Sequence, residues 1–274
     1  MYVGFNLDIN GHNFTSTNNI NGLIIYENYK KRVHQQLDTI ISADGNIDGT
    51  KMREDWFPSV DADIFISHSH SDEEQAIKLA GWLKEELGLT AFIDSCVWGY
   101  AGDLLKKIDD EYCWNEHSKM YDYAKRNYST SHVYMMLSSA LTMMIDKTEC
   151  VFFLNTPTSI KLSEVSSKTL SPWIYHELTM TQLIQKKSPA LHRKDLEKAI
   201  FKHAYESAQL NITYDVDLSN LIDLTDKDLK AWSNNKRASE LKAFIQSKAN
   251  IHPLDLLYGQ KQIINEPVGG SILR

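Results

Sequence analysis

The stretch that decides the fold is DIFISHSHSDEEQAIKLAGWLKEELGLTAFID, residues 63–94. Its apolar, β-branched start at 63–67 is typical of a strand buried on both faces. An apolar stripe at helical spacing follows, with Ser71 and Glu74 spaced as a capping box and Gly88 placed to end the helix. A second apolar run at 89–94 completes a strand–helix–strand unit. This crossover implies a parallel sheet with functional loops at the carboxyl ends of its strands.

The same alternation continues toward the carboxyl terminus. An apolar strand is predicted at 150–154, after a helix at 132–145, and Ser171-Pro172 has the residue types of an N-cap and first helical position. Weaker strands at 212–216 and 221–224 fit edge positions, and a last helix is expected at about 237–248. This order predicts an α/β protein with a flavodoxin-like doubly wound parallel sheet, a fold that hosts many unrelated functions.

The segments before, within and after this alternating pattern are expected to be additions to the main domain. Residues 1–21 are rich in Asn, Gly and Thr and are expected to be loosely structured, and a helix is predicted at 22–42. We therefore expect residues 1–60 to form an N-terminal extension with one helix. The main domain is expected at 61–250, with an aromatic insertion around 112–131, and residues 251–274 are expected to form a C-terminal tail.

Composition narrows the classes of function. The chain has 274 residues and a net charge of −7, from 29 basic and 36 acidic residues, which disfavours a nucleic-acid partner because such binding needs a basic face. No apolar run approaches the length that crosses a membrane, so no membrane partner is expected. Three cysteines without a C-x-x-C spacing indicate free thiols in a reducing compartment. Together with the lack of an export signal, this predicts a cytoplasmic protein.

Several common motifs are missing from the sequence. No G-x-G-x-x-G follows a strand and no G-x-x-x-x-G-K-[ST] occurs, so neither glycine-rich phosphate loop is available. A G-x-S-x-G nucleophile elbow is also missing, which disfavours an α/β-hydrolase. A nucleotide, if one is bound, must therefore be held in another way. No cofactor is expected.

One motif raises the possibility of a metal site. His68, His70 and Asp72 form an H-x-H-x-D string after a buried strand, which resembles the opening of the metallo-β-lactamase zinc motif. The next ligand of that motif is a histidine, whereas this chain has Glu73. A metal-dependent hydrolase therefore stays as an alternative, and we expect no metal.

Three segments match another family better. Residues 63–67 with Ser71-Asp72-Glu73 resemble the first strand and following loop of TIR (Toll/interleukin-1 receptor) domains, and 89–94 resembles their second strand. The segment SPWIYHEL, residues 171–178, resembles the S-x-W-[CV]-x-x-E-[LI] helix of TIR domains that cleave NAD+. The resemblance covers roughly residues 61–250 and implies that Glu177 is catalytic.

The chemistry implied by this resemblance is consistent with a single carboxylate. The nicotinamide of NAD+ leaves as an already cationic group, so no general acid is needed, unlike in ordinary glycosidases. Glu177 is expected to stabilise the oxocarbenium-like ribose with its negative charge. Trp173 lies four residues earlier on the same helix face and is expected to wall the pocket, where packing alone is the alternative.

The remaining binding residues follow from their places in the pattern. Ser67 and His68, at the carboxyl end of the first strand, are expected to reach the ribose or the phosphates. Asp94, at the end of the second strand, and Trp98 and Tyr100 in the loop beyond it are expected to shape the nicotinamide side or to serve assembly.

The resemblance as a whole implies a bacterial-type TIR enzyme similar to those of Thoeris antiviral defence. Its substrate would be NAD+, its product an ADP-ribose-derived signal (ADP-ribose, a cyclic isomer or an adduct), and its target a downstream effector reached by a diffusible nucleotide. TIR enzymes commonly complete their site with a neighbouring copy, so self-association is expected. A non-catalytic TIR adaptor that acts by homotypic assembly is the alternative from another class.

Overall fold

The computed structural model describes residues 1–34, 49–57, 59–162, 167–169, 171–193, 214–215, 217–246 and 249–264, and the statements below refer to these residues. A five-stranded sheet forms the centre of the molecule, and all of its strand pairs are parallel. The strands, in spatial order, are β10 (Leu221–Thr225), β1 (Val3–Asp8), β6 (Cys150–Leu154), β2 (Ile64–Ser67) and β3 (Ala91–Ile93). The protein is therefore an α/β protein with a parallel central sheet.

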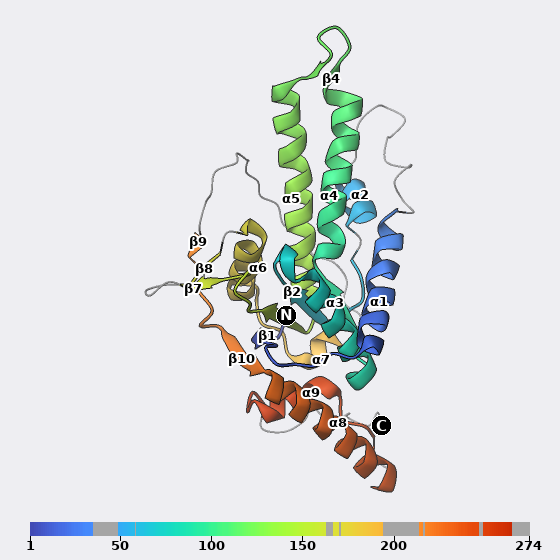
Figure 1. Cartoon of the computed structure of the whole chain (residues 1–274), viewed down its shortest axis with the longest axis vertical. Helices are drawn as coiled ribbons and strands as arrows, with labels where there is room; N and C mark the ends of the chain where they lie inside the picture. Colours follow the sequence, from blue (N-terminus) through green and yellow to red (C-terminus); the bar gives the residue numbers. More distant parts are fainter. Residues whose placement is uncertain are drawn as a thin grey trace.

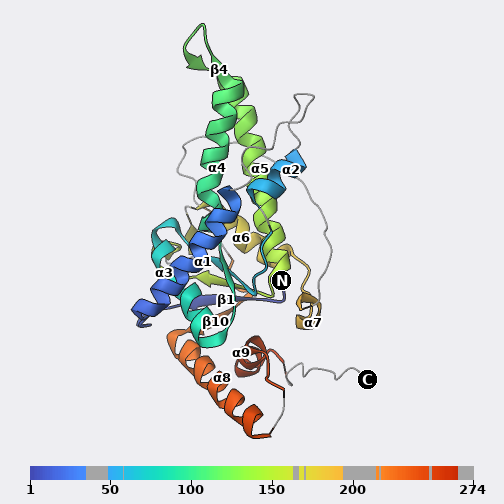
Figure 2. The same cartoon turned by 90° about the vertical axis from the view of Figure 1, so that its right-hand side faces the viewer.

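Helices cover both faces of this sheet (Figures 1 and 2). Ile64 and Ile66 of β2 face one core, shared with α3 (Glu73–Trp82), η2 (Leu83–Leu87), α8 (Asp226–Gln246) and α9 (Pro253–Gln260). Phe65 faces the opposite core, shared with α2 (Gly49–Trp56), α4 (Ser95–Ile108) and α5 (Tyr123–Lys147). The continuous apolar run of β2 thus fits a strand buried on both faces, as the sequence predicts.

The expectation for the first residues is wrong. Residues 3–8 form β1, which lies inside the sheet between β6 and β10, with Phe5 opposite Phe152 and Ile222. The strand is short and interrupted by Gly4 and Asn6, which hides it among the polar residues that follow. The central sheet therefore includes part of the segment 1–60 and does not begin at residue 61.

The expectation that residues 212–216 form an edge strand of the central sheet is also wrong. The predicted strand at 212–216 does not join the central sheet: Tyr214–Asp215 form β9, which pairs with β8 (Ser167–Thr169), itself paired with β7 (Lys161–Leu162), in a small antiparallel sheet. Residues 212, 213 and 216 lie outside the described residues. Numbered along the chain, the five strands of the central sheet lie in the order 3-2-4-1-5, whereas a flavodoxin-like sheet has the order 2-1-3-4-5. The start of the flavodoxin-like order is matched by β3, β2 and β6 if counting begins at β2, and the N-terminal β1 is the departure, because it lies between β6 and β10.

The other predicted elements are present with shifted bounds. The helix predicted at 22–42 is α1 (Ser16–His34), residues 35–42 being outside the described part, and the helix at 237–248 belongs to α8. Gly88 ends its helical segment in the left-handed conformation (φ 72°). The expected capping box is not formed: η1 (His70–Asp72) precedes α3, and Asp72 at the N-cap makes no side-chain capping bond.

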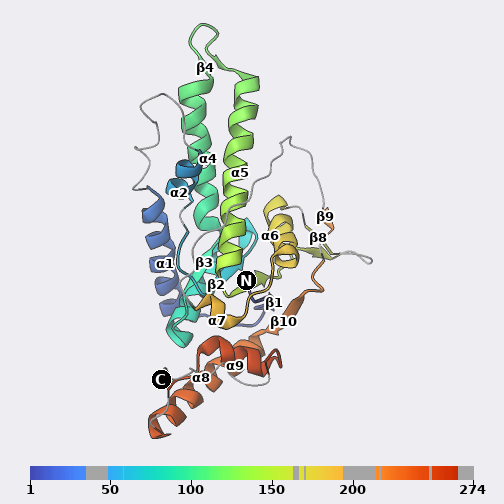
Figure 3. The same cartoon turned by 180° about the vertical axis from the view of Figure 1, so that it is seen from behind.

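The predicted insertion forms the tip of a long helical hairpin. Helices α4 and α5 run side by side away from the sheet, and η3 (Asp109–Cys113), β4 (Trp114–Asn115) and β5 (Met120–Tyr121) connect them (Figures 1 and 3). The aromatic residues that mark this segment include Trp114 and Tyr121, whose rings meet edge to face at 5.0 Å. The helix predicted at 132–145 therefore begins earlier, at Tyr123.

The C-terminal segment is not only a tail. Helix α9 packs its Leu254, Leu257 and Tyr258 side chains, each without exposed surface, into the core beside β1. Short α7 (Pro189–His192) is followed by Arg193, which hydrogen-bonds both Glu149 and Asp255 and so ties α9 to the start of β6. Residues 265–274 lie outside the described part of the chain.

Candidate functional site

Helix α6 (Pro172–Leu183) carries the candidate catalytic residue. As predicted, Ser171 is its N-cap, with its hydroxyl accepting the main-chain N–H of Ile174, and Pro172 occupies the first turn. Glu177 lies one and a half turns further on, and its side chain has no exposed surface. A carboxyl group buried in this way needs specific partners, because burial of an unpaired charge is costly.

The first partner of Glu177 comes from the carboxyl end of β2. The Ser67 hydroxyl donates a hydrogen bond of 2.6 Å to Glu177 Oε2. Because Ser67 is the last residue of β2 and is itself buried, this bond places Glu177 at the carboxyl edge of the sheet. That edge is where parallel α/β sheets bind their ligands.

A second pair lies beside the first. His68 Nδ1 is 2.6 Å from Asp94 Oδ1, and neither side chain is exposed. His68 follows β2 and Asp94 follows β3, so both come from the same edge of the sheet as Ser67. Three of the predicted substrate-binding residues are thus brought together with Glu177.

The two carboxyl groups interact with each other. Burial raises the pKa of Glu177 well above its usual value, and the neighbouring Asp94 charge raises it further, while the Ser67 hydrogen bond opposes the shift. Burial likewise raises the pKa of Asp94, and the neighbouring Glu177 side chain and the main chain of Ser95 and His68 oppose that shift only in part. Both shifts favour the protonated form of these carboxyl groups in the closed site.

The histidine of this group is neutral. Burial lowers the pKa of His68 to about 4, and the negative charges of Glu177 and Glu73 oppose that shift only in part. At neutral pH the imidazole therefore contributes hydrogen bonding to the site and no positive charge.

The alternative metal motif is not assembled. His70 is exposed, His68 is buried against Asp94, and Asp72 accepts hydrogen bonds from the hydroxyls of Ser69, Thr156 and Thr158. Within the described ranges no group of three His, Cys, Asp or Glu side chains has an arrangement that could hold a metal ion. Asp72 instead connects η1 to the loop after β6, because its carboxylate accepts the hydroxyls of Thr156 and Thr158.

Two other predicted site residues, Trp173 and Tyr100, belong to the core on the α4 and α5 face of the sheet. Trp173 is half-buried and packs on the core around α5, with its ring 5.8 Å from that of Tyr134. Tyr100 is buried within α4 rather than in a loop, and its hydroxyl donates to the Lys30 main-chain oxygen at 3.3 Å. Trp98 also belongs to α4, and its side chain lies outside the described part. The predicted loop beyond β3 is therefore helical at these two positions.

Sequence reasoning missed one neighbour of Glu177. His176 Nε2 lies 3.1 Å from the Ser138 hydroxyl and 3.0 Å from that of Thr142, both on α5. Burial lowers the pKa of His176. These contacts fix the rotation of α6 against α5 and thereby direct Glu177 toward the sheet edge. A polar stripe at four-residue spacing, Ser138 and Thr142, is the signal that marks this contact in the sequence.

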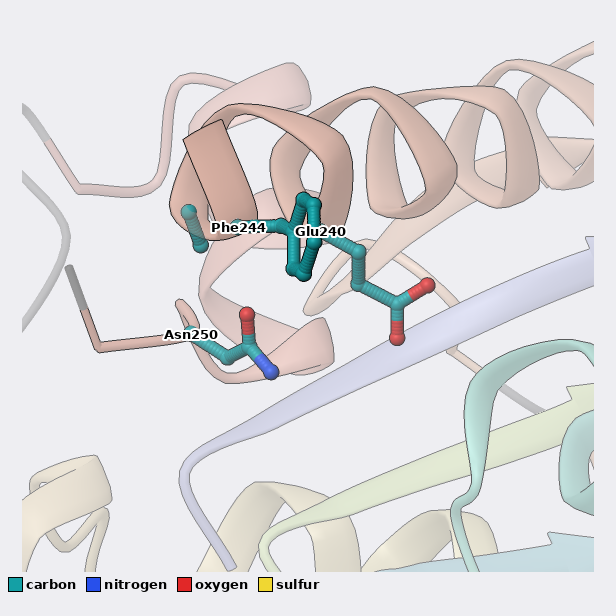
Figure 4. Close-up of a pocket in the computed structure, with 4 residues that line it drawn as sticks. Glu240, Phe244 and Asn250 are labelled. Atoms are coloured by element: carbon teal, nitrogen blue, oxygen red, sulfur yellow. The ribbon is translucent and has the colours of Figure 1, made fainter. Parts of the chain in front are cut away.

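A surface pocket occurs elsewhere. Glu240, Ala243, Phe244 and Asn250 line it, at the carboxyl end of α8 (Figure 4). It contains none of the residues predicted for substrate. Glu177, in contrast, is closed off from solvent.

Comparison of the chain with protein-family models, with curated proteins and with solved structures gave no match. Among the described residues, the structure contains no helix with the length and apolar character needed to span a membrane.

Proposed function

We propose that this chain is a TIR-type enzyme with a flavodoxin-like fold that cleaves the nicotinamide–ribose bond of NAD+, with Glu177 as its catalytic residue. The observation that carries the proposal is the burial of Glu177 at the carboxyl edge of the sheet, against Ser67. The sequence resemblance supports it independently, because it selects this one glutamate among 36 acidic residues.

The charge distribution of the site suits this reaction. Bond cleavage releases neutral nicotinamide from a cationic ring and leaves positive charge on the ribose, which an adjacent carboxylate stabilises. The Ser67 hydrogen bond favours the ionised form of Glu177, and the cationic substrate favours it further. Neutral His68, which lies against Asp94 in the closed site, would hydrogen-bond ribose or phosphate oxygens once the site has opened.

Substrate binding requires the site to open. Glu177 has no exposed surface, so α6 must move away from the ends of β2 and β3 before NAD+ can reach the carboxylate. The half-buried ring of Trp173, near the start of α6, then becomes available as a wall of the pocket. Lid and helix motions of this kind are a common gating step in enzymes.

The broader role rests on the resemblance. We propose a cytoplasmic enzyme that makes an ADP-ribose-derived signal for a separate effector, as TIR enzymes of antiphage defence do. Self-association through TIR contacts is part of this proposal, and it would supply the neighbouring copy that such enzymes use to complete their site.

The test is substitution of the carboxyl group alone. Glu177→Gln keeps the size of the side chain and removes the charge, so nicotinamide release from NAD+ should fall at least about 100-fold. Chromatography of nicotinamide and mass spectrometry of the second product follow the reaction. Asp61→Asn, an exposed carboxyl group that precedes β2 and so lies toward the opposite edge of the sheet, is the matched control and should keep full activity.

Three results would reject this function. Unchanged turnover by Glu177→Gln would remove Glu177 from the mechanism. Absence of nicotinamide release from the wild-type protein, even when assembly is induced, would favour a TIR adaptor. Bound zinc in elemental analysis, with activity lost to a chelator, would instead indicate the metal-dependent hydrolase.

A further inference from the structure

We propose that copies of this chain associate head to tail, with the tip of the α4–α5 hairpin of one copy docked against the carboxyl end of α8 of the next. The contact adds a specific surface to the self-association in the proposed function, and only in that respect does it rest on the proposed function. Neither surface contains Glu177, which lies on α6, so the contact can be tested without NAD+.

The hairpin tip, residues 109–126, is rich in exposed aromatic side chains. It joins α4 to α5 at the end of the hairpin that is farthest from the sheet, and Tyr123 at the start of α5 is 79% exposed (Figure 1). Aromatic residues and Met are enriched where proteins bind one another, because they bury a large area at a low cost in conformational entropy. The large apolar side chains that the tip exposes are Tyr112, Trp114, Met120, Tyr121 and Tyr123.

A second exposed apolar surface lies at the carboxyl end of α8. Leu241, Phe244 and Ile245 share one face of the helix through their spacing of three and four residues, and Phe244 is 85% exposed. An apolar stripe of this kind on a surface marks a site of interaction. The pocket beside it, into which a side chain of a partner can fit, is lined by Glu240, Ala243, Phe244 and Asn250 (Figure 4).

The two surfaces carry opposite net charges. The hairpin tip has five acidic and three basic residues, a net charge of −2, whereas residues 236–246 of α8 have one acidic and three basic residues, a net charge of +2. Complementary charges of this kind favour one partner surface over others. The acidic tip therefore fits the basic end of α8, and its negative charge disfavours an anionic lipid surface as the occupant.

The positions of the two surfaces make the contact intermolecular. The hairpin tip and α8 lie at opposite ends of the long axis of the molecule in two perpendicular views (Figures 1 and 2). The tip therefore cannot reach α8 of its own chain and must dock on a second copy. Because two different surfaces meet, each added copy presents a further tip and a further α8 surface, and assembly continues as an open chain unless it closes into a ring.

Sedimentation velocity of the full chain over a range of protein concentrations tests the contact. The wild-type sedimentation coefficient should rise with concentration. Met120→Lys places a positive charge on the tip against the basic end of α8, and Phe244→Gln removes the apolar ring while keeping a good helix former. Each should raise the concentration needed for assembly at least about tenfold. Both side chains are exposed, so the core is left intact, and circular dichroism establishes that each variant is folded.

An equal mixture of the two variants distinguishes head-to-tail docking from contact between like surfaces. Met120→Lys keeps an intact α8 surface and Phe244→Gln keeps an intact tip, so the mixture should form a complex of two chains that grows no further. Contact between two α8 surfaces would leave Met120→Lys able to assemble, and contact between two tips would leave Phe244→Gln able to assemble. Either of these results would overturn the proposal.

Ile24→Gln on α1 is the matched control. Ile24 belongs to another exposed apolar stripe, with Ile20 and Leu23, which lies outside both proposed surfaces. This variant should assemble as wild type does. Loss of assembly in Ile24→Gln, with assembly retained in Met120→Lys and Phe244→Gln, would move the interface to α1 and overturn the proposal.

The outcomes separate this contact from the proposed function. A wild-type chain that stays monomeric up to its limit of solubility would overturn head-to-tail docking, even if the chain cleaves NAD+. The expected assembly and its loss in both variants, in a protein that releases no nicotinamide, would support the contact and reject the proposed function.

Discussion

The hydroxyl of Ser67 and the carboxyl group of Glu177 meet at 2.6 Å although 110 residues separate them in the sequence. Ser67 ends β2 and Glu177 lies on α6, so this bond connects the sheet edge to the helix that would have to move to admit a substrate. The bond also lowers the pKa of Glu177 against the larger effect of burial. One hydroxyl therefore contributes both to closure of the site and to the charge of its carboxylate.

Removing the Ser67 hydroxyl should weaken both the closure of the site and the ionised form of Glu177. Ser67→Ala leaves Oε2 of Glu177 without its donor, and a lost hydrogen bond to a buried carboxyl group costs about 2 kcal/mol of unfolding free energy. The pKa of Glu177 should rise further, which under the proposed function lowers the rate of nicotinamide release at neutral pH. Urea unfolding and initial rates of nicotinamide release measure the two effects.

The control for this substitution is Ser131→Ala on α5. The Ser131 hydroxyl donates to the Asn127 main-chain oxygen within the same helix and contacts no described residue of the site. It should change the unfolding free energy by less than about 0.5 kcal/mol. Equal urea midpoints for Ser67→Ala and wild type would show that the Ser67–Glu177 bond does not stabilise the folded chain.

The pH dependence of stability should report the neutral state of His68. The ordinary pKa of its side chain is 6.5, and in the folded protein it is about 4, so folding disfavours the protonated form. The resulting contribution is present above pH 6.5 and is lost as pH falls toward 4, by about 3 kcal/mol in total. The raised pKa values of Asp94 and Glu177 act in the opposite direction, because their contribution is lost as pH rises above about 4.

Comparison with His68→Gln separates these opposing effects. Glutamine keeps an amide donor near Asp94 but does not titrate, so this variant should lack the acid destabilisation that wild type shows. The measurement is the midpoint of urea unfolding at intervals between about pH 4 and pH 7.5. A constant difference between the two proteins across that range would mean that the buried imidazole does not change its pKa on folding.

Much of this site could be predicted from the sequence, and the reason is topological. Buried apolar runs identify β2, β3 and β6, and parallel strands bring their carboxyl ends to one edge, which places Ser67, His68 and Asp94 near one another. The Ser-Pro start of α6 fixes the register of Glu177 along that helix. Local signals such as the apolar runs and the Ser-Pro helix start can be recognised without any knowledge of tertiary contacts.

The remainder depends on tertiary packing that local patterns do not encode. β1 is recognisable only once β6 and β10 are placed on either side of it, because Asn6 and Asp8 give it the polarity of a loop. The bond between Ser67 and Glu177 depends on the rotation of α6, which His176 sets through α5. The expected capping box is absent because a turn of 3-10 helix, η1, ends in Asp72, whose carboxylate accepts hydroxyls from the loop after β6.

The crossing of α1 over α3 should be among the least tolerant places in the fold. A Cβ on Gly81 would lie 1.8 Å from the Asn18 main-chain oxygen, and one on Gly22 would lie 1.9 Å from that of Ile77. Backbone atoms cannot yield as a flexible side chain does, so Gly81→Ala must push α1 away from α3. We expect a loss of about 3 kcal/mol in unfolding free energy, measured in urea.

Gly102→Ala is the matched control, because Gly102 lies in α4 and a Cβ added there would meet no described atom within 4 Å. There alanine should stabilise the helix by about 0.5–1 kcal/mol. If both variants shifted the urea midpoint alike, close backbone contact between α1 and α3 would not be what holds them together.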